Sequence, residues 1–104
     1  MSDDAPQAGS GVPAGAISKE LLIVNKRGLH ARASAKFVKA VERFNAQVWV
    51  TRGGEPVGGT SIMGLMMLAA GIGSTIDVRV EGPEADGLAA ALTSLVQGRF
   101  GEEF

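Results

Sequence analysis

The sequence predicts an α+β fold in which a four-stranded antiparallel sheet is covered on one face by three helices. Segments with the two-residue repeat of strands alternate with segments that have the 3.6-residue repeat of helices, in the order β-α-β-β-α-β-α. The strand segments are short and alternate apolar with polar side chains, which is typical of an antiparallel sheet with one solvated face. The helices must then pack on the other face, as a two-layer sandwich.

The first two elements are a strand and a long helix. Residues 17–24 alternate as a strand, and residues 25–28 form a turn that contains Gly28. From residue 29 to residue 44 the apolar spacing becomes helical. The buried stripe expected on this helix consists of Ala33, Phe37, Ala40, Val41 and Phe44.

A hairpin is predicted next. Residues 46–52 alternate as a second strand, and Gly53-Gly54 is a signal for a two-residue hairpin turn. A short, weak third strand follows at residues 55–58, where Pro56 indicates an edge position or an irregular start.

A short helix, a strand and a final helix complete the fold. Residues 62–69 are expected to form the short helix, and residues 75–81 alternate clearly as a strand. Pro83 occupies the first turn of the last helix, which Gly98 ends. The residues that this helix is expected to bury are Ala85, Leu88, Leu92 and Leu95.

The two ends of the chain differ from the middle in composition. Residues 1–15 have almost nothing to bury, so we expect a disordered leader before a single domain over residues 16–104. Residues 98–104 are expected to form a frayed tail.

Composition argues against several classes of function. The net charge of −1 provides no basic excess for nucleic acid, and the absence of cysteine excludes thiol chemistry and thiolate metal sites. A single histidine and the lack of an acidic loop indicate neither a zinc nor a magnesium site, so no metal or cofactor is expected. The longest weakly polar stretch, residues 62–73, falls short of the roughly 20 residues that span a bilayer. We therefore expect no membrane partner and a cytoplasmic location.

His30 is the only histidine, and it stands at the start of the first long helix. The amino end of a helix exposes unsatisfied backbone N–H groups and carries the positive end of the helix dipole, so it favours phosphate and other anions. Arg32 adds a planar set of donors suited to phosphate oxygens, while Ala31 and Ala33 leave the approach open. A neutral imidazole in this place is a nucleophile whose phosphorylated form can pass the group on. These residues indicate a phosphoryl carrier.

Two other interpretations stay open on the residues alone. A lone histidine at a helix start is commonly a surface residue or a cap, and the chain would then be a regulatory or ligand-sensing module. A hydrolase with His30 as its base is a weaker alternative, because there is no cysteine and neither Ser34 nor Ser61 lies in the setting of an activated serine.

Two segments resemble parts of a known family. Residues 25–33, with the sequence NKRGLHARA, resemble the active-site segment of HPr, the histidine-containing phosphocarrier of the phosphoenolpyruvate phosphotransferase system. Residues 61–66, with the sequence SIMGLM, resemble the second helix of that family, which begins at a regulatory serine. The separation of the two motifs and the order of elements also agree, over residues 17–96.

The resemblance implies an open-faced β-sandwich and a phosphocarrier that acts as a covalent intermediate rather than as a stand-alone enzyme. His30 would be phosphorylated on Nδ1 by enzyme I, using phosphoenolpyruvate, and would pass the phosphoryl group to an enzyme IIA. Arg32, with Ala31 and Ala33 beside it, would bind the phosphoryl group. Ser61 would be a target of HPr kinase/phosphorylase, and the protein would act as a monomer.

Two positions depart from the family pattern. Ala33 stands where many sugar-transport members have proline, and alanine there resembles the branch tied to nitrogen and regulatory phosphorelays. Arg27 replaces a small polar residue three positions before the histidine, which removes a side-chain cap and adds positive charge beside the phosphate.

The methionine-rich helix at residues 62–69 is the expected docking surface. One short helix cannot bury residues on all sides against a sheet, so Leu65 and Leu68, with one or two methionines, should face inward. Ile62, Met63 and Met66 should then be partly exposed beside His30, where adaptable thioethers suit several partners. The basic rim expected around this surface consists of Arg27, Arg32 and Lys39.

Overall fold

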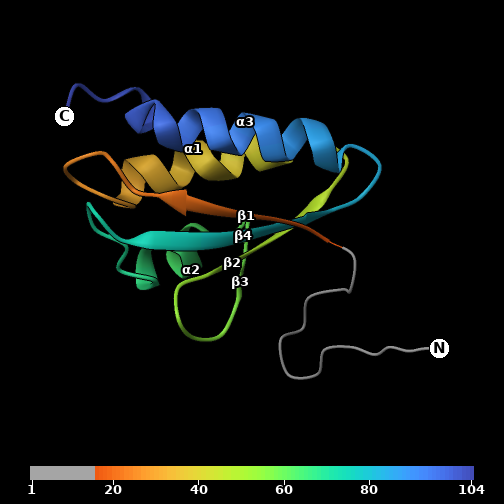
Figure 1. Ribbon diagram of the computed structural model, residues 1–104, viewed down its shortest axis with the longest axis horizontal. Coiled ribbons are helices and arrows are strands. Elements are labelled where there is room, and N and C mark those ends of the chain that lie inside the picture. The colour runs from red at the N-terminus through yellow and green to blue at the C-terminus, as the bar shows by residue number, and fades with distance from the viewer. Residues whose placement is uncertain (1–15) are drawn as a thin grey trace.

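The computed structural model describes residues 16–104, so the expected leader at residues 1–15 lies outside the described part. The helices and strands follow one another in the predicted order (Figure 1). They are β1 (Ile17–Leu22), α1 (Ala31–Glu42), β2 (Gln47–Thr51), β3 (Val57–Gly58), α2 (Ile62–Met67), β4 (Thr75–Glu81) and α3 (Ala85–Gln97), after which comes a short 3₁₀ helix, η1 (Arg99–Gly101).

The strands form one antiparallel sheet in the order β1-β4-β2-β3. The central strand β4 pairs Ile76 with Leu21 of β1 and Val78 with Val50 of β2. All four side chains are buried, because alternate residues of a strand point to the same face and these positions share the face that the helices cover. The predicted four-stranded antiparallel sheet is confirmed.

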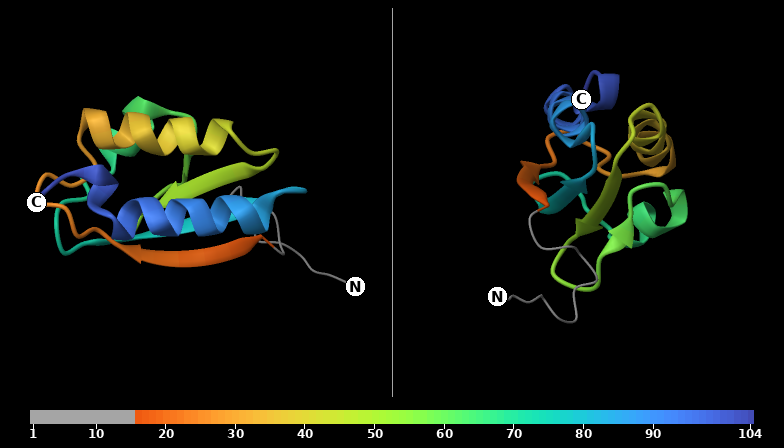
Figure 2. Two further views of the ribbon diagram at one scale, coloured as in Figure 1. Left: turned by 90° about the horizontal axis from the view of Figure 1, so that it is seen from above. Right: turned by 90° about the vertical axis from the view of Figure 1, so that its right-hand side faces the viewer.

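The three helices lie on one side of this sheet, and its other face is left open (Figure 2). In Figure 1, α1 and α3 run side by side above β1 and β4, and α2 lies near β3. Phe37 of α1 and Leu88 and Leu92 of α3 are fully buried against the strands. The core therefore sits between the sheet and the helices, as the predicted two-layer arrangement requires.

The predicted two-residue hairpin between β2 and β3 is wrong. Pairing ends at Val50 with Val57, and residues 52–56 form a longer loop in which Gly53 has a positive φ of 75°. Pro56, the next position toward the turn, has no pairing partner on β2, so the strands separate before they reach the two glycines.

The predicted frayed tail is also wrong. After α3 the chain turns through η1, and Phe100 is fully buried. The carbonyl oxygen of Phe100 accepts a hydrogen bond of 2.6 Å from Lys36 Nζ of α1. Leu95, expected in the core, is only partly buried, and the neighbouring Val96 takes the fully buried position instead. The end of the chain is thus packed against α1, close to its amino end.

Candidate functional site

A tight loop between β1 and α1 positions His30. Gly28 adopts a φ of +66°, and a Cβ there would collide with the carbonyl oxygen of Ala70. The next residue, Leu29, is buried and donates its N–H to that same oxygen at 3.0 Å. On the helix side of the loop, the N–H of the buried Ser34 donates to the carbonyl of His30 at 2.8 Å and holds the backbone of His30 to the first turn of α1. Only glycine fits the left-handed conformation and the close approach to Ala70 at residue 28. Gly28 thereby sets the direction in which the chain leads into His30.

His30 is the N-cap of α1, as its place in the sequence predicts. Its backbone is extended, with φ −71° and ψ 179°, and its Nδ1 accepts a hydrogen bond of 3.3 Å from the N–H of Arg32. The first N–H groups of a helix have no partner within the helix, and these groups in α1 belong to Ala31, Arg32 and Ala33. Nδ1 therefore lies at the electropositive end of α1. The ring remains accessible, with 19% of its side chain exposed.

The other ring nitrogen, Nε2, contacts the carboxylate of Glu102. Glu102 comes from the end of the chain, and only 14% of its side chain is exposed. Asn25, which is fully buried, holds this carboxylate by donating from Nδ2 to Glu102 Oε1 at 3.0 Å. The same Nδ2 also donates to the carbonyl of Gly28 at 2.9 Å, so one amide ties the loop to the C-terminal residues.

Glu102 is held as an anion. Burial alone raises the pKa of its carboxyl group, but hydrogen bonds from Asn25 and His30, together with the positive charge of His30 and Arg27, lower it by more. The resulting pKa lies below the ordinary value of 4.5. A carboxylate at neutral pH can only accept hydrogen bonds, so the hydrogen between Glu102 and Nε2 belongs to the imidazole.

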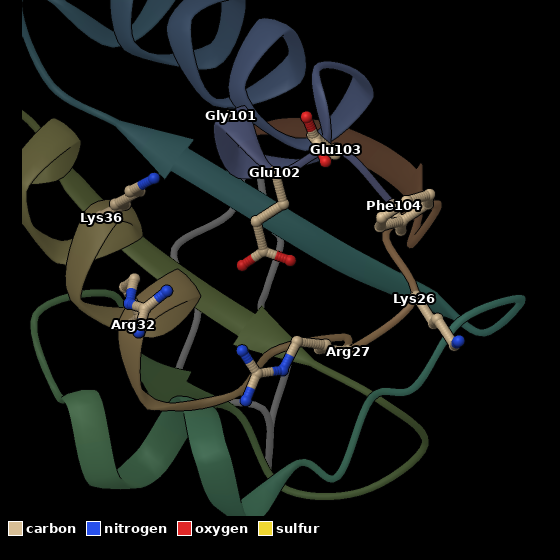
Figure 3. A pocket seen from close by; sticks show the side chains of 8 residues that line it. All are labelled: Lys26, Arg27, Arg32, Lys36, Gly101, Glu102, Glu103 and Phe104. Carbon is tan, nitrogen blue, oxygen red and sulfur yellow. The ribbon is translucent and has the colours of Figure 1, made fainter.

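Four basic side chains surround this carboxylate in a pocket between α1 and the C-terminal residues. In Figure 3, the carboxylate of Glu102 points toward the space between Arg27 and Arg32, whereas Glu103 points away. Arg32 is exposed, so its guanidinium is accessible from solvent. The basic residues that line the pocket are Lys26, Arg27, Arg32 and Lys36.

The sequence analysis did not identify Glu102 as a neighbour of His30. The two residues lie 72 positions apart, and Glu102 belongs to a polar, glycine-containing stretch with no periodicity. The one available signal was Phe100, a large apolar residue that needs a buried place.

Of the apolar side chains expected beside His30, the structure places Met66 of α2 in the groove next to it. Met66 and Ala69 line a groove with His30 and Arg27, and Leu65 is buried beneath them. Ile62 and Met63 are 41% and 72% exposed. The prediction that one or two methionines face inward is wrong, because Met67 is 77% exposed and Met66 43%. Leu65 is the one buried residue of this six-residue helix, and Leu68 at its C-cap is partly buried against the core, as predicted.

Ser61 and Lys39 occupy different surroundings. Ser61 is exposed and caps α2, where its Oγ accepts a hydrogen bond of 2.9 Å from the N–H of Gly64.

Lys39 lies two turns beyond Arg32, in a groove between α1 and α3 that it shares with Arg43. It lines neither of the two pockets that contain Arg27, so the structure does not bring it to His30 with the rest of the predicted rim.

Over residues 16–104, no group of three or more histidine, aspartate or glutamate side chains is arranged to hold a metal ion. In the same range, no helix is long and apolar enough to cross a membrane.

Comparison with known proteins agrees with the geometry of the site. Residues 17–98 match the family described as PTS HPr component phosphorylation site. The chain belongs to the HPr family of phosphocarrier proteins. It is 48% identical over 86 residues to phosphocarrier protein HPr of Cupriavidus necator, covering 83% of this chain and 97% of that protein. It is 35% identical over 86 residues to phosphocarrier protein NPr of Shewanella violacea, covering 83% of this chain and 94% of that one.

The fold agrees as well. The crystal structure of HPr from Thermoanaerobacter tengcongensis superimposes with a TM-score of 0.80 and 36% identity, covering 85% of this chain and 99% of that one. The open-faced sandwich predicted from the sequence is therefore confirmed, and the family implies partners within the phosphotransferase system.

Proposed function

We propose that His30 accepts a phosphoryl group on Nδ1 from phosphorylated enzyme I and passes it to an enzyme IIA. The observation that carries this proposal is the orientation of the ring. Nε2 is engaged by Glu102, and Nδ1 accepts from the N–H of Arg32 at the amino end of α1. The nitrogen with the available lone pair is therefore the one next to the anion-binding end of the helix.

The transfer needs no base in this chain. The lone pair of Nδ1 forms the new N–P bond while the bond between phosphorus and the donor breaks, and its electrons remain on the donor. Nδ1 carries no proton in this tautomer, so none has to leave. Ala31, Arg32 and Ala33 offer backbone N–H groups to the phosphoryl oxygens, and the guanidinium of Arg32 adds charge-assisted hydrogen bonds. The reverse sequence releases the group to the acceptor.

The docking surface for enzyme I and enzyme IIA consists of Ile62, Met63 and Met66, with Met67 as an addition. Met66 lines the groove beside His30, and Ile62, Met63 and Met67 are exposed on the same short helix, so a partner that covers them comes close to Nδ1. Arg27 contributes a positive charge at the rim of this groove. Lys39 extends the basic surface along α1 for an acidic partner, although it lies apart from the groove.

Ser61 is the proposed site of regulation by HPr kinase/phosphorylase. Its hydroxyl is exposed directly before Ile62, so a phosphate there places a dianion at the edge of the docking surface. A partner with an acidic surface would be repelled, while the helix end itself tolerates the added negative charge.

The working unit is proposed to be a monomer of the phosphocarrier domain at residues 16–104, in the cytoplasm and without a bound cofactor. A second solved form of the Thermoanaerobacter tengcongensis protein is an HPr dimer, so the mass of this protein in solution is a direct check. Ala33 supports a role in the nitrogen and regulatory branch, and the related NPr protein is consistent with it.

Incubation with labelled phosphoenolpyruvate and the cognate enzyme I tests the proposal. One phosphoryl group per chain should be bound in an alkali-stable, acid-labile form, and His30→Gln should bind none. Glutamine can accept the N–H of Arg32 as histidine does, so α1 keeps its cap. A label that survives in His30→Gln would place the acceptor elsewhere, and no label in the wild type would favour a ligand-sensing module.

A further inference from the structure

The last residues of the chain, Arg99–Phe104, form what we call the C-terminal segment. We propose that Glu102 of this segment is a positioning residue that keeps the proton of His30 on Nε2 both before and after the phosphoryl group binds. The inference rests on the proposed function, because it assigns a role in the same transfer. It extends that function, because it states that the orientation of the His30 ring is controlled by a residue 72 positions away in the sequence.

Two contacts demand the same tautomer of His30. A neutral imidazole carries one proton on one of its two nitrogens. The carboxylate of Glu102 accepts only, so the nitrogen that faces it, Nε2, must carry the hydrogen. The N–H of Arg32 donates to Nδ1, so Nδ1 must present its lone pair. A carboxylate that accepts from one ring nitrogen commonly fixes the tautomer of a functional histidine in this way.

The carboxylate cannot easily turn away, because three features hold the C-terminal segment. Asn25 Nδ2 donates to Oε1 of Glu102, which leaves Oε2 for His30. Phe100 is fully buried, and Lys36 binds its carbonyl oxygen. Arg99 and Phe100 both adopt left-handed φ values, 60° and 54°, which non-glycine residues keep only when surrounding contacts outweigh the strain.

The same contact favours release of the phosphoryl group. When the N–P bond at Nδ1 breaks, its electrons return to the ring. A ring with a proton on Nε2 leaves as neutral imidazole, whereas a ring without it would leave as an imidazolide anion. A carboxylate beside Nε2 favours the protonated form by charge and by hydrogen bonding. Glu102 therefore makes the phosphorylated ring a better donor to the next protein.

None of the other charged groups around His30 favours a proton on its ring. Arg27 from the loop and Arg32 from α1 are cationic, and they favour the bound phosphoryl group rather than the proton. The α2 side of the groove contributes Met66 and Ala69 and no charge. Among the described residues, Glu102 is thus the single anion in contact with the ring.

Glu102→Gln tests the proposal, and Glu103→Gln is the matched control. Asn25 donates toward Oε1, so the amide oxygen of the new glutamine should take that position and its NH₂ group should face Nε2. Such a group donates to Nε2 and moves the ring proton toward Nδ1. The side chain of Glu103 is exposed and points away from the ring, so its neutralisation changes net charge equally without this effect (Figure 3).

The nitrogen-15 NMR spectrum of the imidazole reads the tautomer directly. The wild type and Glu103→Gln should carry the proton on Nε2, and Glu102→Gln should populate the Nδ1–H form. Its phosphorylation by enzyme I should slow by about tenfold, the usual worth of one hydrogen bond to a charged group. Hydrolysis of its N–P bond should also be slower than in the wild type at neutral pH, because the carboxylate that favours the protonated ring is gone.

Each remaining outcome decides the question. A wild-type ring with its proton on Nδ1 overturns the inference whatever the variants do, and so does a Glu102→Gln protein with wild-type spectrum and rates. If Glu102→Gln does not fold, Glu102→Asp serves instead, because it keeps the charge but has a shorter side chain. If the N–P bond of Glu102→Asp is hydrolysed with the same pH dependence as in the wild type, the positioning role of Glu102 is also rejected. If wild-type His30 is never phosphorylated, the proposed function fails rather than this inference.

Discussion

Asn25 and Glu102 lie 77 positions apart in the sequence, and the buried amide of Asn25 donates a hydrogen bond of 3.0 Å to the carboxylate of Glu102. That bond joins the loop before α1 to the C-terminal segment. Because the same carboxylate contacts His30, the placement of the His30 ring depends on two segments that are far apart in the sequence.

Asn25→Ala should therefore destabilise the protein. It removes the hydrogen bonds to Gly28 and to an ionised Glu102, so we expect the free energy of unfolding to fall by about 1–2 kcal/mol. Urea denaturation followed by the fluorescence of Trp49 measures this loss. Asn45→Ala is the control, because Asn45 is exposed and should change stability by less than about 0.5 kcal/mol. Equal stability of the two variants would contradict the structural role of Asn25.

Arg32→Glu should slow phosphoryl transfer while the fold stays intact. Arg32 is exposed, so its replacement disturbs no core contact, but the new carboxylate repels the phosphoryl oxygens at Nδ1. We expect transfer from enzyme I to slow by at least about tenfold, in line with the loss of other donors to a developing anion. Arg43→Glu makes the same charge change at the exposed far end of α1. If both variants slow transfer equally, overall charge rather than the position of Arg32 is responsible.

Much of this arrangement was predictable, and the reason differs between residues. Alternation over residues 46–52 and 75–81 predicted strands with one buried face, because a sheet with one solvated face repeats every two residues. Val48, Val50 and Val78 are buried accordingly. The helix start at His30 was equally readable, because caps and dipoles act within one turn.

The contacts that were missed act over a long distance in the sequence. Glu102 reaches His30 only through the turn after α3, where Arg99 and Phe100 take left-handed conformations that no local pattern predicts. The loop before β3 was misjudged for the opposite reason. Gly53-Gly54 satisfies a local rule for a tight turn, but the pairing of β2 with β3 ends at Val50 and Val57, before the two glycines.

Acid should loosen the C-terminal segment before it unfolds the rest. The pKa of Glu102 in the folded protein lies below its ordinary value of 4.5, so its stabilising effect is complete above that pH and is lost as the pH falls through the lowered pKa. The difference in unfolding free energy between the wild type and Glu102→Gln should therefore shrink steadily below pH 4.5. Urea denaturation at a series of pH values measures it. A difference that grows on acidification would mean that Glu102 is stabilised as the neutral acid.

Met63→Glu should weaken docking to enzyme I without changing the chemistry at His30. Met63 is 72% exposed on α2, so a charge there costs little stability but places an unpaired carboxylate in an apolar contact. Steady-state kinetics should show a KM for this protein raised by about tenfold or more and a nearly unchanged kcat. Leu22→Glu is the control, because Leu22 is 50% exposed and alternates with the buried Leu21 and Ile23, which places it on the open face of the sheet. A rise in KM for Leu22→Glu instead would move the docking surface to that face.

Ser61 combines two roles that substitution can separate. Its Oγ caps α2 by accepting the N–H of Gly64, and its phosphorylation would add charge next to Ile62. Aspartate and asparagine are both good N-caps, so Ser61→Asp and Ser61→Asn should both keep α2 formed. Their free energies of unfolding should lie within about 0.5 kcal/mol of each other. The two variants then differ by one negative charge at the edge of the docking surface.

Ser61→Asp should bind enzyme I about three- to tenfold more weakly than Ser61→Asn, and this difference in affinity should become smaller as salt screens the charge. Isothermal titration at two salt concentrations measures both effects. Equal affinities at low salt would mean that charge at Ser61 does not reach the partner, and the regulatory role would have to be abandoned.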